Sequence, residues 1–293
     1  MIIDFHTHIF PPHIAQNRER FLNRDRWFGE LYSNPKAPIA SAEDLIASMD
    51  DGNVDKAVTF GFAWADPGLC REANDYVMDA VSRYPDRLIG FISVNPCAIE
   101  ETEKEIERCV AKGLAGIGEL MPDGQRFSCD EASVTNPLGE IARHYHLPIL
   151  THTSEPVGHL YPGKGTRPLS SIVDFAERFP DVVLVCAHWG GGLFFYELMP
   201  KLVHVLRNVY YDTAASLFVY RDRIFQTAAH IAPDKLLFGT DYPLISHRKF
   251  LRRVRATGLS AAAERGLLGE NARRILFKDQ THTGAGEDDG KLR

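Results

Sequence analysis

The stretch MIIDFHTH (residues 1–8) leads from an aliphatic run that contains one aspartate into two histidines separated by a single residue. Residues 1–5 predict a β-strand, because they are mostly aliphatic or aromatic. Alternate residues of a strand face the same side, so His6 and His8 at its carboxyl end can direct both imidazoles into one cavity. An H-x-H pair alone is a weak signal. The pair becomes informative only if other metal-binding residues lie at the same end of the predicted strands.

Seven further segments have the composition of buried parallel strands, being rich in β-branched or aliphatic residues and bounded by Gly, Pro or Asp. These predicted strands are residues 54–60, 88–93, 116–119, 147–151, 182–187, 209–212 and 236–239. Helix-length amphipathic segments fill the gaps, at residues 42–50, 71–84, 101–112, 136–146, 170–179, 193–205, 220–230 and 248–257. A capping box at residues 41–44 opens the first of them. Eight strands alternating with helices predict an α/β protein with a single (β/α)8 TIM barrel, rather than a doubly wound open sheet.

The composition is that of a globular protein. Of 293 residues, 44% are hydrophobic and 25% charged, which excludes disordered, collagen-like and coiled-coil chains. Length alone allows two domains or one large barrel. Candidate metal-binding residues follow both the first predicted strand (His6 and His8) and the last (Asp241), which favours one barrel over residues 1–278. Two features lie outside the repeat: a long loop after the first strand (10–40) and a helical C-terminal ending. The polar, glycine-rich tail 279–293 is expected to be disordered.

Charge and targeting signals narrow the class of partner. The net charge of −6 argues against nucleic acid as the main partner, because phosphate binding needs clustered Lys and Arg. The sequence contains no apolar run of about 18 residues, so no membrane span is predicted. No signal peptide is expected, and five cysteines without a C-x-x-C pair indicate reduced thiols in a cytoplasmic protein. A small-molecule substrate is therefore expected, and homo-oligomer formation stays open.

Residues that can bind a metal gather at one end of the predicted strands. Besides His6 and His8, Glu119 ends the fourth strand, and His152, His188 and Asp241 follow the fifth, sixth and eighth. That end of a barrel is where active sites form, so these six residues together predict a divalent-metal site. The remaining histidines are less informative. Those in helices or the tail (His144, His146, His204, His230 and His282) have ordinary surface or core roles, while His13, His159 and His247 near the same rim stay open.

With these residues in hand, the sequence resembles the amidohydrolase superfamily and, within it, the amidohydrolase-related group. The motifs that carry the resemblance are DFHTH (4–8), TH (151–152), AHWG (187–190), GTDYP (239–243) and the ending GENARRILF (269–277). The resemblance covers about residues 1–278. It implies a metal-dependent TIM-barrel hydrolase or decarboxylase.

The resemblance also assigns roles at the site. It implies that His6, His8 and Asp241 bind one divalent metal, joined by His152 in mononuclear members, and that His152 and His188 hold a second metal in binuclear ones. The strand-four position often carries a carboxylated lysine in the superfamily, whereas here it is Glu119, as in the TatD-like deoxyribonucleases. Glu119 could bridge two metals, bind one or support a ligand, and a direct ligand is favoured. Zinc is the expected metal and manganese the alternative, with one or two ions bound.

Two reaction classes and one non-catalytic alternative follow from the resemblance. The first expectation is hydrolysis of a small ester, lactone or amide, in which the metal activates water, Asp241 moves the proton and His188 polarises the substrate. The alternative is removal of CO2 from an aromatic or unsaturated acid, as in members similar to aminocarboxymuconate-semialdehyde decarboxylase. A metal-binding scaffold without catalysis is the third.

The substrate contacts are less certain from the sequence. For the decarboxylase, a cation and flat walls are needed, and Arg71, Arg167, Trp64 and Trp189 are candidates by loop placement. Within the long loop, Trp27, Phe28 and Tyr32 either line the pocket or pack the loop down, with neither favoured.

Overall fold

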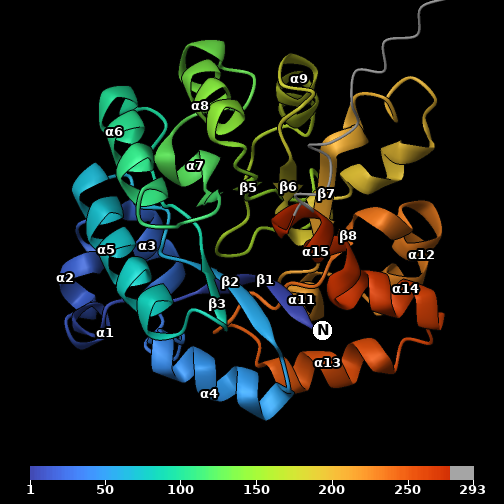
Figure 1. Ribbon diagram of the computed structural model, residues 1–293, viewed down its shortest axis with the longest axis horizontal. Coiled ribbons are helices and arrows are strands. Elements are labelled where there is room, and N and C mark those ends of the chain that lie inside the picture. Colours follow the sequence, from blue (N-terminus) through green and yellow to red (C-terminus); the bar gives the residue numbers. More distant parts are fainter. Residues whose placement is uncertain (278–293) are drawn as a thin grey trace, which may run out of the picture.

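The computed structural model describes residues 1–277, which form a ring of parallel strands with helices around it (Figure 1). The strands are β1 (Ile3–His8), β2 (Lys56–Phe60), β3 (Leu88–Gly90), β4 (Ile117–Leu120), β5 (Ile149–Thr151), β6 (Leu184–Cys186), β7 (Val209–Asp212) and β8 (Leu236–Leu237). They pair in parallel in the orders β1-β2-β3 and β4-β5-β6-β7-β8.

Isolated parallel bridges join these two sheets at both seams. Thr7 of β1 pairs with Tyr242 beyond β8, and Ile92 beyond β3 pairs with Ile117 of β4. Backbone hydrogen bonds support each seam, among them Phe5 N to Phe238 O at 2.7 Å. The predicted TIM-barrel fold is therefore confirmed. Its first and last strands lie side by side, which brings residues from the two ends of the chain together.

Most of the helices lie outside the ring (Figure 1). The helices are α1 (Pro12–Gln16), α2 (Arg18–Leu22), α3 (Arg26–Tyr32), α4 (Ala42–Gly52), α5 (Pro67–Arg83), α6 (Ile99–Val110), α7 (Pro122–Gln125), α8 (Ala132–Tyr145), α9 (Ser170–Arg178), α10 (Ala187–Gly190), α11 (Ser216–Val219), α12 (Arg223–Ile231), α13 (His247–Arg255), α14 (Ala261–Arg265) and α15 (Asn271–Leu276). Shorter or irregular turns are η1 (Leu193–Leu198), η2 (Leu206–Asn208), η3 (Pro233–Lys235) and η4 (Gly266–Glu270). The predicted capping box opens α4, with Ser41 and Asp44 exchanging hydrogen bonds.

Two layers of apolar packing hold the barrel. Side chains such as Phe5, Val58 and Leu150 fill its interior. Alternate residues of the same strands face the helices and form the larger outer cluster, for example Ala57 and Ile149. Burial on both faces explains the continuously apolar strand segments of the sequence.

The segment after β1 differs from the prediction. Residues 10–40 were expected to form a loop, but they contain the short helices α1, α2 and α3. The Asp25 carboxylate caps α3 by accepting the backbone N–H of Phe28. Phe21, Trp27 and Phe28 are buried against Trp64 and their neighbours, so a separate aromatic cluster holds this segment on the barrel.

A second difference lies after β6. Residues 193–205 were predicted to form one helix, but only the 3-10 turn η1 forms and the chain then turns irregularly. Pro200 disfavours helical geometry at the preceding residue, and Met199 is extended. The helix predicted at 220–230 likewise begins only at Arg223.

Among residues 1–277, no helix combines the length and apolarity needed to cross a membrane. The five cysteines are all free. The predicted disordered tail, 279–293, lies outside the described residues, and the 1–278 domain boundary stays a prediction.

Candidate metal centre

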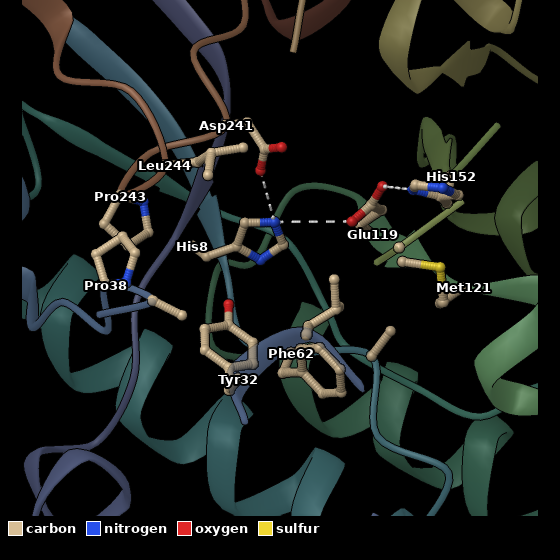
Figure 2. Close-up of a pocket in the computed structure, with 14 residues that line it drawn as sticks. His8, Tyr32, Pro38, Phe62, Glu119, Met121, His152, Asp241, Pro243 and Leu244 are labelled. Carbon is tan, nitrogen blue, oxygen red and sulfur yellow. Dashed lines mark hydrogen bonds and ion pairs between the residues drawn. The ribbon is translucent and has the colours of Figure 1, made fainter. Parts of the chain in front are cut away.

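The six metal-binding candidates all lie at the carboxyl-terminal end of the barrel. His6 and His8 are on β1, Glu119 is on β4, and the other three directly follow β5, β6 and β8. Figure 2 shows His8, Glu119, His152 and Asp241 directed toward one another. The closed ring therefore brings together every residue that the sequence predicted for the site.

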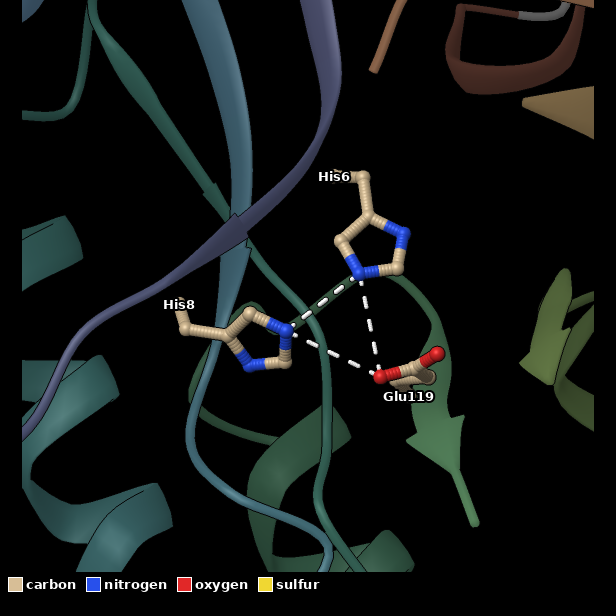
Figure 3. Close-up of side chains that lie close together, drawn as sticks. All are labelled: His6, His8 and Glu119. Carbon is tan, nitrogen blue, oxygen red and sulfur yellow. Dashed lines mark hydrogen bonds and ion pairs between the residues drawn. The ribbon is translucent and has the colours of Figure 1, made fainter. Parts of the chain in front are cut away.

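The first group of ligand atoms surrounds the β1 histidines. The Nε2 atoms of His6 and His8 are 3.3 Å apart, and each lies 3.7 Å from Oε2 of Glu119 (Figure 3). Oδ1 of Asp241 lies 3.6 Å from His6 Nε2 and 3.4 Å from His8 Nε2. Two imidazole nitrogens and two carboxylate oxygens thus converge on one point.

The second group shares Glu119 but uses its other oxygen. Oε1 of Glu119 lies 3.1 Å from Nδ1 of His152 and 3.8 Å from Nε2 of His188. The two imidazoles approach to 3.1 Å. His152 thus groups with Glu119 and His188, and these three could hold an ion apart from the His6–His8–Glu119 group. Glu119 lies between the two groups with one oxygen toward each.

The hydrogen bonds at the Nδ1 atoms of the histidines show why the cluster can bind a cation. His8 Nδ1 faces the carbonyl oxygen of Gly61 at 3.3 Å, and His188 Nδ1 faces that of Ala214 at 3.1 Å. A carbonyl oxygen only accepts, so both Nδ1 atoms carry hydrogen, and in a neutral ring each Nε2 is then a bare lone pair. His6 Nδ1 likewise donates to Asp212. The lone pairs facing one another suit a divalent metal, which binds neutral imidazole and carboxylate together.

The charges of the site point the same way. Burial lowers the pKa of His6, but the carboxylates of Asp212, Glu119 and Asp241 outweigh it and raise that pKa to about 10. Burial also opposes ionisation of Glu119 and Asp241, yet the surrounding histidines hold the pKa of Glu119 well below its usual range and that of Asp241 at about 2. The carboxylates of the cluster therefore stay ionised and require positive charge, which protons or a metal can supply.

Two buried aspartates that sequence reasoning missed hold the ligands in place. Asp212, at the end of β7, accepts from His6 Nδ1 at 2.8 Å through one oxygen and from the backbone of His188 and Ala214 through the other. A carboxylate behind a ligating imidazole fixes its tautomer and orientation. Its position in the sequence could have indicated this role, because Asp212 ends a predicted strand at the same edge of the barrel as the ligands.

Asp4 plays the corresponding part on β1. It accepts the backbone N–H groups of His6 and Thr240 and the Thr240 hydroxyl, and it lies 3.0 Å from Nε2 of His247. His247 was expected near the rim, but it is fully buried at the start of α13, where Ser48 also contacts it. His247 therefore contacts Asp4 on β1 and does not line the pocket.

A pocket of about 140 Å³ opens above the cluster. His8, Glu119, His152 and Asp241 form its polar part, and apolar side chains from Leu31, Phe62, Met121 and Leu244 wall the remainder (Figure 2). Tyr32 also lines it, whereas Trp27 and Phe28 pack into the aromatic cluster beneath. The helical segment after β1 therefore contributes one wall of the pocket.

The other predicted substrate contacts do not line this pocket. Trp64 and Trp189 are fully buried, the first against Phe28 and the second donating to Ser216. Arg71 contacts Glu105 at 3.4 Å, and Arg167 lies 4.0 Å from Asp123. His13 pairs with Glu72 at 2.6 Å and His159 is exposed. Loop placement was too weak a signal to find the walls, because it did not show that Trp64 and Trp189 pack inward.

Known proteins resemble this chain over most of its length. It is 23% identical to the 2-amino-3-carboxymuconate-6-semialdehyde decarboxylase of Dictyostelium discoideum, over 94% of this chain and 92% of that protein. The 5-carboxyvanillate decarboxylase of Sphingomonas paucimobilis shares the fold, with a TM-score of 0.77, 17% identity and coverage of 94% of this chain and 98% of that one. The corresponding enzyme of Novosphingobium aromaticivorans, solved with manganese and 4-hydroxy-3-methoxy-5-nitrobenzoic acid, has a TM-score of 0.74, 18% identity and coverage of 94% and 96%.

The family model described as "Amidohydrolase" matches residues 3–278, almost the whole described chain and every residue of the cluster. The resemblance noted on the sequence motifs is therefore confirmed: the chain belongs to the amidohydrolase family, whose enzymes include the decarboxylases that it resembles.

Proposed function

We propose that the protein is a metal-dependent decarboxylase of an aromatic or unsaturated carboxylic acid. The observation that carries the proposal is the pocket, in which a buried histidine–carboxylate cluster lies at the base of apolar walls. A planar acid would fit this pocket with its carboxylate against the polar cluster and its ring against the apolar walls. The full-length relatives are decarboxylases of such acids, which supports this alternative over the hydrolysis expected first.

His6, His8, Asp241 and Glu119 would hold the principal metal ion, and Glu119, His152 and His188 a second. A divalent metal there would act as a Lewis acid that binds and orients the substrate carboxylate. Manganese is supported by the ion in the related structure, and zinc suits the same mixture of imidazole and carboxylate ligands. His188, held through Nδ1 by Ala214, keeps Nε2 directed at the cluster, where it would polarise a substrate oxygen if no second ion is bound.

Asp241 is placed to move the proton. Its Oδ1 faces the histidines, while Oδ2 has no hydrogen bond or ion pair with any residue of 1–277, and the residue lines the pocket. In the reaction, the ionised Asp241 carboxylate takes up one proton from the solvent at Oδ2 and delivers it to the carbon that bears the substrate carboxylate, which returns Asp241 to its ionised form. The carbon–carbon bond then breaks, its electron pair stays on the substrate, and CO2 leaves. The products are the protonated substrate skeleton and CO2, without an oxidant or reductant.

Hydrolysis of a small ester, lactone or amide is the second candidate. The observation in its favour is Glu119, which presents one oxygen to each of two histidine groups, as in two-metal hydrolytic sites. The same Oδ2 atom of Asp241 would then take a proton from water and pass it to the leaving group.

The experiment incubates metal-loaded protein with two panels, hydroxybenzoic and unsaturated acids and then esters and lactones. Headspace CO2 and hydrolysis products are both quantified. The proposal predicts CO2 from at least one acid, lost with a chelator, restored by Mn²⁺ or Zn²⁺, and lost in Asp241→Asn. Hydrolysis without any CO2 would replace it by the second candidate. No turnover in either panel by fully loaded protein would favour a non-catalytic scaffold.

A further inference from the structure

The four histidines of the cluster are not all held in the same way. Three of them present Nε2 to the cluster and face, at Nδ1, an oxygen that only accepts hydrogen bonds. His152 has the reverse orientation. Its Nδ1 lies 3.1 Å from Oε1 of Glu119 (Figure 2), and its Nε2 lies 3.1 Å from the hydroxyl oxygen of Ser154. Ser154 is therefore the outer partner of the fourth imidazole.

The hydroxyl group of Ser154 can both donate and accept, so it allows His152 two arrangements of hydrogen. With hydrogen on Nδ1, the imidazole donates to Glu119 and accepts the hydroxyl hydrogen at Nε2. With a metal ion on Nδ1, the hydrogen lies on Nε2 and is donated to the Ser154 oxygen. The ring is neutral in both arrangements, because one hydrogen leaves Nδ1 and one is taken up at Nε2. Ser154 thus provides a partner for Nε2 in either case.

The position of Ser154 is fixed by its neighbours. The side chain is buried, and its oxygen accepts the backbone N–H of Gly165 at 2.9 Å. The next residue, Thr166, donates its own N–H to the Asp123 carboxylate at 2.9 Å, which holds this part of the chain in place. On the other side, a Cβ at Gly191 would collide with the Ser154 carbonyl oxygen, so the two backbones pack directly together. The hydroxyl oxygen is therefore held at one place relative to the imidazole that it contacts.

We propose that Ser154 is a positioning residue of the metal centre, which orients His152 and presents its Nδ1 lone pair to a metal ion. The inference rests on the metal centre of the proposed function and not on the reaction. Ser154 does not line the substrate pocket, so its effect reaches the centre through His152. Outer partners of ligating imidazoles contribute about 10- to 100-fold to metal affinity, and Ser154→Ala should weaken binding of the ion that His152 holds by about tenfold or more.

The test measures metal affinity by competition between the protein and a chelator for Zn²⁺, without any substrate. Ser154→Ala should bind the ion more weakly than wild type, and Ser154→Thr, which keeps the hydroxyl, should retain most of the affinity. Ser171→Ala is the matched control. Ser171 lines the same small cavity of about 20 Å³, but its hydroxyl donates to Pro168 and does not contact His152. Its affinity should stay at the wild-type value.

A double-variant cycle shows whether Ser154 acts through His152. In the His152→Asn background, adding Ser154→Ala should change the remaining metal affinity by less than about twofold. A loss of equal size in both backgrounds, an equal loss in Ser154→Thr, or wild-type affinity in Ser154→Ala would overturn the inference. Metal binding in the predicted pattern, with no CO2 released from any acid, would leave the inference standing while the proposed decarboxylation fails.

Discussion

The carboxylate of Asp212 lies 2.8 Å from Nδ1 of His6, with both side chains completely buried at the end of the barrel. The opposite oxygen of Asp212 accepts the backbone N–H groups of His188 and Ala214, so the carboxylate cannot rotate freely. This contact holds a hydrogen on His6 Nδ1 and leaves Nε2 free to bind a metal. The first prediction follows from it.

Asp212→Asn should weaken metal binding by about 10- to 100-fold. The backbone donors will retain the amide oxygen, so the amide NH2 will face His6 Nδ1 and force the hydrogen onto Nε2, where the metal should bind. Chelator competition measures the change in metal dissociation constant. Asp174→Asn, on the exposed side of α9, is the control. An Asp212→Asn protein that folds and retains wild-type metal affinity would refute the role given to this pair.

The second prediction concerns metal stoichiometry. Because Glu119 divides the ligands into two groups, fully loaded protein should carry up to two ions per chain. His188→Asn should remove the second ion and spare the first, since His188 lies in only one group. Elemental analysis of gel-filtered protein gives the ratio. A wild-type maximum of one ion, unchanged in His188→Asn, would assign the metal to a single group.

Metal removal should also lower stability. An ion that binds only the folded chain stabilises it by about 2.7 kcal/mol when its concentration is 100 times the dissociation constant. Chelated protein should therefore unfold several degrees below the loaded form, and adding Mn²⁺ or Zn²⁺ should restore the transition. Differential scanning calorimetry makes the comparison. Coincident transitions would mean that the cluster does not bind these ions in the native state.

Tyr32→Phe should weaken binding of an ortho-hydroxy acid by about three- to tenfold, the effect of one neutral hydrogen bond. Metal content should stay unchanged, because the ring keeps its stacking on Phe28. Calorimetry with 2-hydroxybenzoate and with benzoate separates the two contributions. An equal loss for both acids would assign Tyr32 to packing instead of recognition of the substrate oxygen.

A buried acid outside the site predicts a pH dependence of stability. Burial raises the pKa of Glu105, but hydrogen bonds from Arg108 and Asn74 outweigh it and leave that pKa below the usual value. A depressed pKa in the folded state means that Glu105 adds stability above the unfolded-state pKa of about 4.3, and that this is lost as the pH falls through the folded value. Glu105→Gln should therefore destabilise the protein at pH 7 and much less at pH 3.

Urea titrations at both pH values provide the measurement for Glu105. Glu107→Gln, an exposed neighbour on the same helix, is the control and should change little at either pH. A Glu105→Gln effect of equal size at both pH values would show that the loss arises from packing and not from the charge.

The barrel and the six metal-binding candidates could be predicted because parallel strands expose their carboxyl ends at one edge. Each of the six residues needed only its place relative to a strand, which alternation in the sequence supplies. The supports were harder to find. Asp212 and the Asp4–His247 pair act through hydrogen bonds between segments distant in sequence.

The pocket walls could not be predicted from the sequence. Tyr32 and Phe28 lie four residues apart on the same short helix, yet one faces the pocket and the other is buried. That choice depends on how α3 packs against Trp64 and Phe62, which no local pattern encodes. The reaction class was equally hard to predict, because the ligands are compatible with both hydrolysis and decarboxylation, and only the relatives favour the second.

The most direct test of metal-dependent decarboxylation is proton NMR of a turned-over acid in D2O. Manganese-loaded wild-type protein should place one deuterium at the carbon that carried the carboxylate, in step with CO2 release, whereas Asp241→Asn and chelated protein should not. Conversion of a substrate by loaded wild-type protein with no deuterium at that carbon and no CO2 would contradict it.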